Sequence, residues 1–129
     1  EIQLLVSTDG GMTYQTTNYL TNLIAIPVAG GSNVSVTSTT AMWFTNNFGT
    51  GATRATYSGS IRMFNPGDST LNKVFTMAGT GPNSTSPAYF SYIGGGIWNS
   101  ASAVNAFRVI ASTGKLQTGA VRCYGVAKA

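Results

Sequence analysis

The sequence predicts an all-β fold, a sandwich or a barrel of antiparallel strands, with about nine strands and no substantial helix. Short segments rich in β-branched and aromatic residues recur along the chain, and turns of Gly, Pro, Asn and Asp separate them at the spacing typical of such folds. No window combines a 3.6-residue apolar period with helix caps. The chain shows no linker and no fixed-period repeat, so we expect a single domain over residues 1–129.

The N-terminal half is expected to contain four strands. The first alternates in polarity and ends at Asp9 and Gly10, a dipeptide typical of tight turns. The second is mostly apolar, and its β-branched isoleucines together with Pro27 favour a strand over a helix. The third is β-branched and polar, and the fourth is short and apolar. Their ranges are residues 2–7, 20–28, 33–40 and 41–45.

The C-terminal half is expected to contain five more strands. Asn65 to Asp68 form a strong turn signal that ends the first of them. Residues 79–87 are the longest irregular stretch, and Gly94 to Gly96 are predicted to interrupt the third strand. The ranges are residues 58–65, 70–78, 88–93, 105–112 and 119–126.

Residues 105–126 give the clearest strand pair in the sequence, a β-hairpin with a polar connection between two alternating arms. We expect the arms to pair with Ser112 opposite Thr118. This register places four side chains on the inward face, as Phe107 opposite Cys123 and Val109 opposite Val121. Cys123 is therefore expected to be buried as a small hydrophobic residue.

The same register places Arg108 opposite Arg122 on the outer face of the hairpin. Like charges that lie directly opposite each other repel, and the apolar neighbours on this face should not all meet water. We therefore predict that another subunit covers this face, most simply in a homotrimer. The predicted interface residues are Arg108, Ile110, Arg122, Tyr124 and Val126.

The composition argues against several classes of function. The chain carries seven Lys and Arg, three Asp and Glu, and no His, for a net charge of +4. Because the basic residues are spread out, we expect no nucleic-acid binding. No apolar run approaches the roughly 20 residues of a transmembrane helix, so no membrane insertion is expected. Without His, and with scattered carboxylates, we expect neither enzymatic activity nor a cofactor.

Asp9 is the residue that most resembles a metal ligand, because it lies in a Gly-rich turn. A calcium site needs several oxygen ligands, including more than one acid, so a turn-forming role is expected and no metal site is predicted. Cys123 is the only cysteine and cannot form an internal disulfide.

Aromatic side chains are the candidates for ligand binding. Trp98 follows three glycines and precedes Asn99, and an indole beside amides and hydroxyls is typical of sugar recognition. The alternative is that Trp98 fills the end of the sandwich core. Tyr57, Tyr89 and Tyr92 are open to the same two interpretations. The predicted ligand-binding set is Trp98, Asn99, Tyr92 and Tyr57.

Three stretches of the chain, residues 7–14 with Tyr19, residues 59–66 and residues 106–126, together resemble a β-sandwich module of tailed-bacteriophage tail and appendage proteins. Residues 7–14, with Tyr19, resemble the opening of that module, and residues 59–66 resemble its central strand and turn. Residues 106–126 resemble its closing hairpin, which ends in an aromatic-Gly-aliphatic triplet. The stretches occur in the expected order and are spread along nearly the whole chain, from residue 7 to residue 126. Cys123 departs from the larger aliphatic residue expected there.

The resemblance implies a jelly-roll-like sandwich on the surface of a virion, often trimeric, with other virion proteins as partners. It offers no catalytic residues. The expected function is a tail-fibre or head-fibre appendage module that attaches to host-surface glycans. The alternative is a capsid decoration or tail-assembly protein whose only partners are virion chains.

Overall fold

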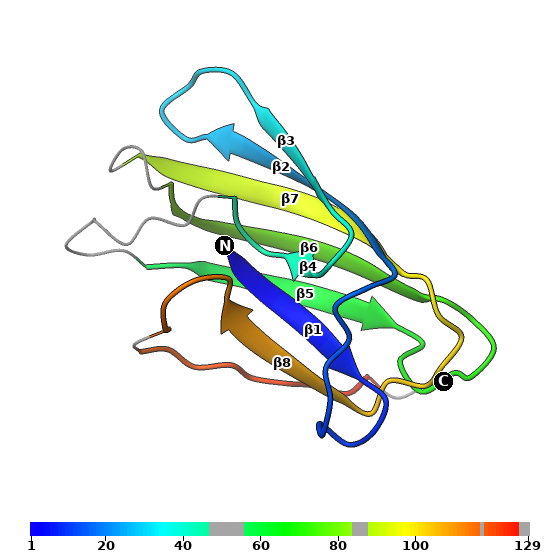
Figure 1. Ribbon diagram of the computed structural model, residues 1–129. Helices are drawn as coiled ribbons and strands as arrows, with labels where there is room; N and C mark the ends of the chain where they lie inside the picture. The colour runs from blue at the N-terminus through cyan, green and yellow to red at the C-terminus, as the bar shows by residue number, and fades with distance from the viewer. Residues whose placement is uncertain (47–55, 84–87, 117, 127–129) are drawn as a thin grey trace.

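The computed structural model describes residues 1–46, 56–83, 88–116 and 118–126, and these residues form strands, turns and loops without a helix (Figure 1). Eight strands build two antiparallel sheets, which confirms the predicted all-β sandwich. The strands are β1 (Ile2–Ser7), β2 (Tyr19–Pro27), β3 (Val34–Ser38), β4 (Met42–Trp43), β5 (Ser58–Phe64), β6 (Lys73–Pro82), β7 (Tyr89–Trp98) and β8 (Ala106–Ala111).

The two sheets differ in width. The larger sheet has five strands in the order β3-β2-β7-β6-β5, and the smaller has three in the order β4-β1-β8. β1 pairs with β8, the last of the described strands, while β2 pairs with β7 in the other sheet. The β1–β8 pair thus encloses the β2–β7 pair along the chain, which passes from the smaller sheet to the larger after β1 and back before β8.

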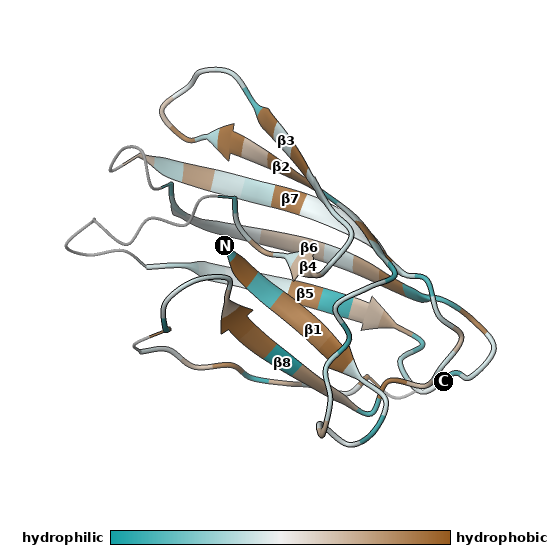
Figure 2. Ribbon diagram, in the orientation of Figure 1, coloured by the Kyte–Doolittle hydropathy of each residue, from teal (hydrophilic) through white to brown (hydrophobic). Residues whose placement is uncertain are grey.

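The core lies between the sheets and draws alternate side chains from each. On β1 and β4, Leu4 opposes Met42, and both are buried. On the larger sheet, β2 and β6 alternate between buried and exposed side chains along most of their length. Hydrophobic colour is concentrated on β1 and β8, whereas much of β7 is pale (Figure 2). The buried apolar residues are Ile2, Leu4, Leu5, Val6, Tyr19, Leu23, Ala25, Ala41, Met42, Phe44, Phe75, Met77, Tyr92 and Trp98.

The predicted break at Gly94–Gly96 is wrong, because β7 continues through all three glycines to Trp98. β7 is the central strand of the larger sheet, with β2 on one side and β6 on the other. A Cβ atom at Gly94 or Gly96 would overlap the carbonyl oxygens of Asn22 and Leu20 on β2. Glycine is needed here because the neighbouring backbone occupies the space of a side chain.

The predicted end of a strand at residue 78 is also wrong, because β6 runs on to Pro82. The ring of Tyr57 lies where a Cβ atom of Gly59 or Gly79 would stand. An aromatic side chain over paired glycines replaces the packing that they lack, so the strand persists.

The predicted closing hairpin is wrong in its second arm. The first arm corresponds to β8, but β8 pairs with β1, with Val109 opposite Leu4 and Phe107 opposite Val6. Residues 119–126 belong to no strand, and all of their side chains are exposed. In Figure 1 this orange-red segment is drawn as a coil that runs back below β8. A high β-strand propensity does not by itself produce a strand where the backbone has no hydrogen-bonded neighbouring strand.

Candidate functional site

Trp98 is a core residue and not an exposed sugar platform. Its side chain is only 3% exposed, and its indole N–H donates a hydrogen bond to the carbonyl oxygen of Thr17 (3.2 Å). It lies at the end of β7, opposite Tyr19 on β2 and Lys73 on β6. The ring face is therefore unavailable for stacking on a ligand, which corrects the ligand-binding assignment and supports the alternative that Trp98 fills the core.

Tyr92 lies inside the sandwich, and Tyr57 is partly buried against its core. Tyr92 is fully buried, and its hydroxyl donates to the carbonyl oxygens of Asn46 (3.3 Å) and Pro82 (3.4 Å). The Tyr57 ring lies 6.4 Å from Tyr92 and 6.3 Å, edge-on, from Phe44. Burial raises the pKa of both tyrosines to about 12. These rings stabilise the core, and the ligand-binding assignment of Tyr92 does not hold.

Asn99 is the exposed member of the predicted ligand set, and it is already engaged with its own chain. Its backbone N–H donates to the carbonyl of Asn18 (2.7 Å), and its side-chain oxygen accepts from the Asn72 amide (2.9 Å). Asn99 therefore joins the end of β7 to two neighbouring loops. Asn99 is exposed, whereas Trp98 and Tyr92 are buried and Tyr57 is partly buried.

The predicted interface residues do not come together as the hairpin register required. Arg108 is paired with Leu5 of β1, and Arg122 lies in no strand. The Arg108 guanidinium lies 4.3 Å from the centre of the Tyr14 ring, a cation–π contact within the chain. Ile110 is partly buried against the core. Tyr124 and Val126 are exposed by 80% and 82%. Cys123 is exposed as well, contrary to the prediction, because no strand seats it on the inward face.

Asp9 has a structural role in the turn after β1, as expected. Its carboxylate accepts hydrogen bonds from the backbone and hydroxyl of Thr13 and from the hydroxyl of Ser7. These hydrogen bonds lower the pKa of Asp9 to about 2, and those from Thr13 have the largest effect. The same turn is tied to the start of β8, since Asn105 accepts from the Gly10 amide (2.9 Å) and donates to the Thr8 carbonyl (2.9 Å).

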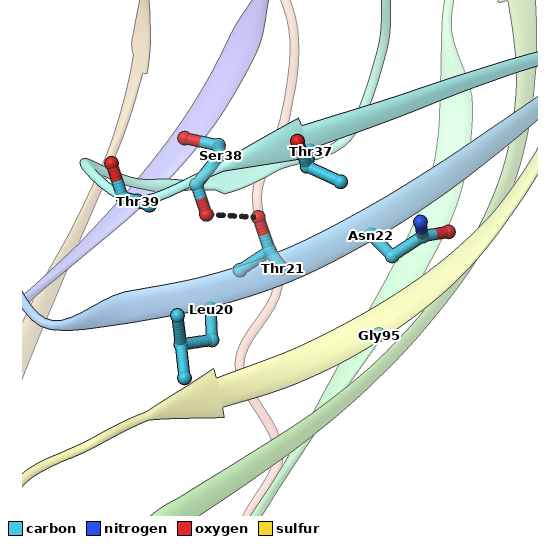
Figure 3. A pocket seen from close by; sticks show the side chains of 7 residues that line it. All are labelled: Leu20, Thr21, Asn22, Thr37, Ser38, Thr39 and Gly95. Carbon is cyan, nitrogen blue, oxygen red and sulfur yellow. Dashed lines mark hydrogen bonds between the residues drawn. The ribbon is translucent and has the colours of Figure 1, made fainter.

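The outer face of the larger sheet carries a shallow depression that sequence analysis missed (Figure 3). Gly95 lies on β7 between Asn22 of β2 and Thr76 of β6, and its lack of a side chain lowers the surface there. Figure 3 shows Thr21 donating to the carbonyl oxygen of Ser38 between β2 and β3 (3.2 Å). The lining residues are Leu20, Thr21, Asn22, Thr37, Ser38, Thr39 and Gly95. Hydroxyl and amide groups are present, but no aromatic ring is.

An apolar row lies beside this depression on the same outer face. The register places Phe64 opposite Val74, Val74 opposite Ile97, and Ile97 opposite Leu20 across four neighbouring strands. Three of these side chains count among the exposed large hydrophobic residues, with Leu20 the most exposed of the four at 56%. The row is visible only once the strand register is known, because its members are far apart in the sequence.

Lys73 is a second feature that sequence analysis missed. It occupies an inward position at the start of β6, is fully buried, and donates to the carbonyl oxygen of Leu71. Lys73, Phe75 and Met77 occupy alternate positions along β6 and therefore face the same way. This alternation would predict an inward lysine if the start of the strand were known. Asp68 lies in the turn before β6. The pKa of its carboxyl is lowered, mainly by hydrogen bonds from Thr70.

Within the described ranges, no three His, Cys, Asp or Glu side chains gather closely enough to hold a metal ion. None of the described residues forms a helix that could span a membrane. Comparison of the chain with known protein families, with curated proteins and with solved structures gave no significant match. Exposed apolar side chains lie both in residues 119–126 and on the outer face of the larger sheet.

Proposed function

We propose that this chain is a structural module of a bacteriophage virion that works by assembling with other virion chains, first of all with copies of itself in a homotrimer. The observation that carries the proposal is the exposed apolar segment after β8. Val121, Tyr124 and Val126 are exposed by 67%, 80% and 82%. Such side chains in a short stretch are typical of an interface that is covered in an assembly. The resemblance to phage appendage modules supports the setting, a particle surface outside the cell.

Assembly is favoured over attachment to glycans because two of the three aromatic residues expected to stack on sugars are buried and the third, Tyr57, is partly buried. Trp98 and Tyr92 have their rings in the core, while the exposed aromatic ring of Tyr124 lies in the apolar segment. Sugar binding needs an accessible ring beside hydrogen-bonding groups. The structure of the outer surface therefore supports contacts with protein more than contacts with carbohydrate.

The proposal is tested by the mass of the purified protein as a function of concentration. Light scattering should give an oligomer at high micromolar concentration. The double variant Tyr124→Ser/Val126→Ser should weaken assembly at least tenfold, because it removes apolar area from the interface. Leu116→Ser is the matched control, since Leu116 is also exposed but lies before the segment. A wild-type chain that stays monomeric at these concentrations would contradict the proposal, and antibody labelling of particles tests the virion setting.

Attachment to host-surface glycans is the second candidate, and the depression at Gly95 favours it. Its hydroxyl and amide groups can donate and accept hydrogen bonds as a sugar requires. Asn22→Ala should then abolish binding to glycan arrays without a change in the oligomer. Tyr124→Ser should leave glycan binding intact, so the two candidate functions are separable.

A further inference from the structure

We infer that residues 119–126 are a β-strand that completes the three-stranded sheet of a second copy of this chain by pairing with the outer edge of β8. The inference rests on the proposed assembly function and names the surface and the partner through which assembly takes place. Three observations support it. β8 has an edge to which no described strand is bonded, residues 119–126 belong to no sheet, and their side-chain pattern matches that of the β8 edge.

Among the described strands, none lies beside one long edge of β8. β8 is bonded to β1 along its whole length, and it is the last strand of the sheet order β4-β1-β8. Phe107 shows the consequence: it shares a face with buried Val6, yet it is 37% exposed. An open edge offers unpaired N–H and C=O groups, which proteins normally cover or pair. The smaller sheet therefore has a vacant position for a fourth strand.

Residues 119–126 have the composition of a strand but none of its contacts. Within the described chain they belong to no sheet, and no hydrogen bond joins them to another described residue. Apolar side chains on both faces of an extended segment are exposed, Val121 on one and Tyr124 on the other. A segment whose backbone and both faces lack partners is suited to enter a sheet and to be covered there.

The segment matches the vacant position in its side-chain pattern. Antiparallel pairing with Cys123 opposite Phe107 puts Val121 opposite Val109. β8 already presents Phe107 and Val109 on the inward face, beside Val6 and Leu4 of β1. The added strand would cover the exposed part of Phe107 and extend the core, while Tyr124 would point to the outer face, towards a neighbouring subunit.

The second copy is favoured over the segment's own chain because residues 119–126 form no ladder with their own β8. The connection begins at Ser112, whose N–H donates to the carbonyl of Glu1 (2.8 Å), so the end of β8 is fixed. A seven-residue connection can span roughly 23 Å when extended, which exceeds the roughly 5 Å between neighbouring strands. Exchange of a terminal strand forms equivalent contacts in every copy and closes a symmetric oligomer.

Disulfide formation between two differently marked chains tests the exchange. One chain carries Phe107→Cys with Cys123→Ser, and the other is the unaltered chain, whose only cysteine is Cys123. The two are unfolded together, refolded as a mixture and oxidised mildly. Directly opposed residues of an antiparallel pair lie close enough for a disulfide. We expect a covalent one-to-one dimer on mass spectrometry of the unreduced sample.

The matched control replaces Phe107→Cys by Arg108→Cys in the same Cys123→Ser background, because residue 108 faces the opposite side of β8. This control should give little of the one-to-one product. If the first variant misfolds, Val109→Cys and Val121→Cys in separate Cys123→Ser chains test the same register.

The inference is overturned if the one-to-one product does not exceed the control. It is also overturned if the single variant Phe107→Cys, which keeps Cys123, forms its disulfide within one chain, since the segment then folds back on its own β8. An oligomer by light scattering without the mixed disulfide would reject the exchange alone. A monomer at every concentration would reject the proposed function as well.

Discussion

β7 and residues 119–126 are opposites in composition and in surroundings. β7 contains three consecutive glycines, yet it lies at the centre of the five-stranded sheet with a strand bonded on each side. Residues 119–126 include two valines and a tyrosine, yet they belong to no sheet of the described chain. The residues with poor strand propensity are therefore the ones that are most completely paired.

The difference shows that a strand in this protein is decided by what lies alongside it. The backbone of β2 approaches Gly94 and Gly96 so closely that only glycine fits, and both neighbours of β7 form complete ladders with it. Residues 119–126 have suitable side chains but no bonded edge. Strand propensity measures how well side chains fit such surroundings, and it cannot supply them.

The largest difference in the free energy of unfolding is expected when one aromatic residue in each region is truncated, Trp98 at the end of β7 and Tyr124 in residues 119–126. Trp98→Ala should lower the free energy of unfolding by about 4 kcal/mol, because it leaves a cavity in the core. Tyr124→Ala should change the stability of the dilute monomer by less than about 0.5 kcal/mol, since its ring is exposed. Denaturant unfolding measures both values. A cost for Tyr124→Ala close to that of Trp98→Ala would mean that residues 119–126 are packed within their own chain.

A smaller effect is expected from adding one methyl group to a glycine of each region. Gly96→Ala should lower the free energy of unfolding by about 3 kcal/mol, because the new Cβ overlaps the Leu20 carbonyl and β2 must shift. Gly125→Ala meets no atom within 4 Å, so its effect should stay within about 0.5 kcal/mol. Thermal unfolding of the two variants compares them directly. Equal effects would contradict the close approach of β2 to β7.

The smallest effect on stability is expected at the turn after β1, which is hydrogen-bonded to Asn105 at the start of β8. Residues 119–126, beyond the other end of β8, have no such hydrogen bonds to the described chain. Hydrogen bonds from Thr13, first of all, hold the folded pKa of Asp9 at about 2, below its ordinary value of 3.8. The ionised form is therefore favoured by folding, and its contribution is present above about pH 4 and lost as the pH falls towards 2.

Asp9→Asn tests this pH dependence. Melting temperatures of the wild type and the variant should differ at neutral pH and converge near pH 2, where the wild-type carboxyl is protonated. Asp68→Asn is the matched control in the turn before β6; it should leave the contribution of Asp9 and its pH dependence in place. A difference between wild type and Asp9→Asn that is constant with pH would contradict the role of the carboxylate in the turn.

Most of the fold could be predicted from the sequence, because alternation and turn residues are local signals. Residues 2–7 were predicted within the bounds of β1, and the other seven strands were found with shifts at their ends. The errors have a common cause. The glycines of β7 and the continuation of β6 beyond residue 78 depend on the backbone of β2 and on the ring of Tyr57, which come from other parts of the chain.

The candidate sites were harder to predict, because exposure depends on the register of distant strands. Trp98 beside Gly and Asn has the local composition of a sugar site, but its place opposite Tyr19 and Lys73 turns it into the core. The depression at Gly95 and the apolar row from Phe64 to Leu20 exist only across paired strands. The virion setting and the trimer remain predictions from resemblance and surface chemistry.

Amide hydrogen exchange at two protein concentrations tests the central claim, that residues 119–126 gain their strand partner by assembly. In the dilute monomer the amides of residues 119–126 should exchange as fast as an unstructured peptide, whereas those of β7 are protected. At a concentration where light scattering shows the oligomer, protection should appear in residues 119–126 while β7 is unchanged. Full protection of the segment in the dilute monomer, or its rapid exchange in the oligomer, would contradict the account.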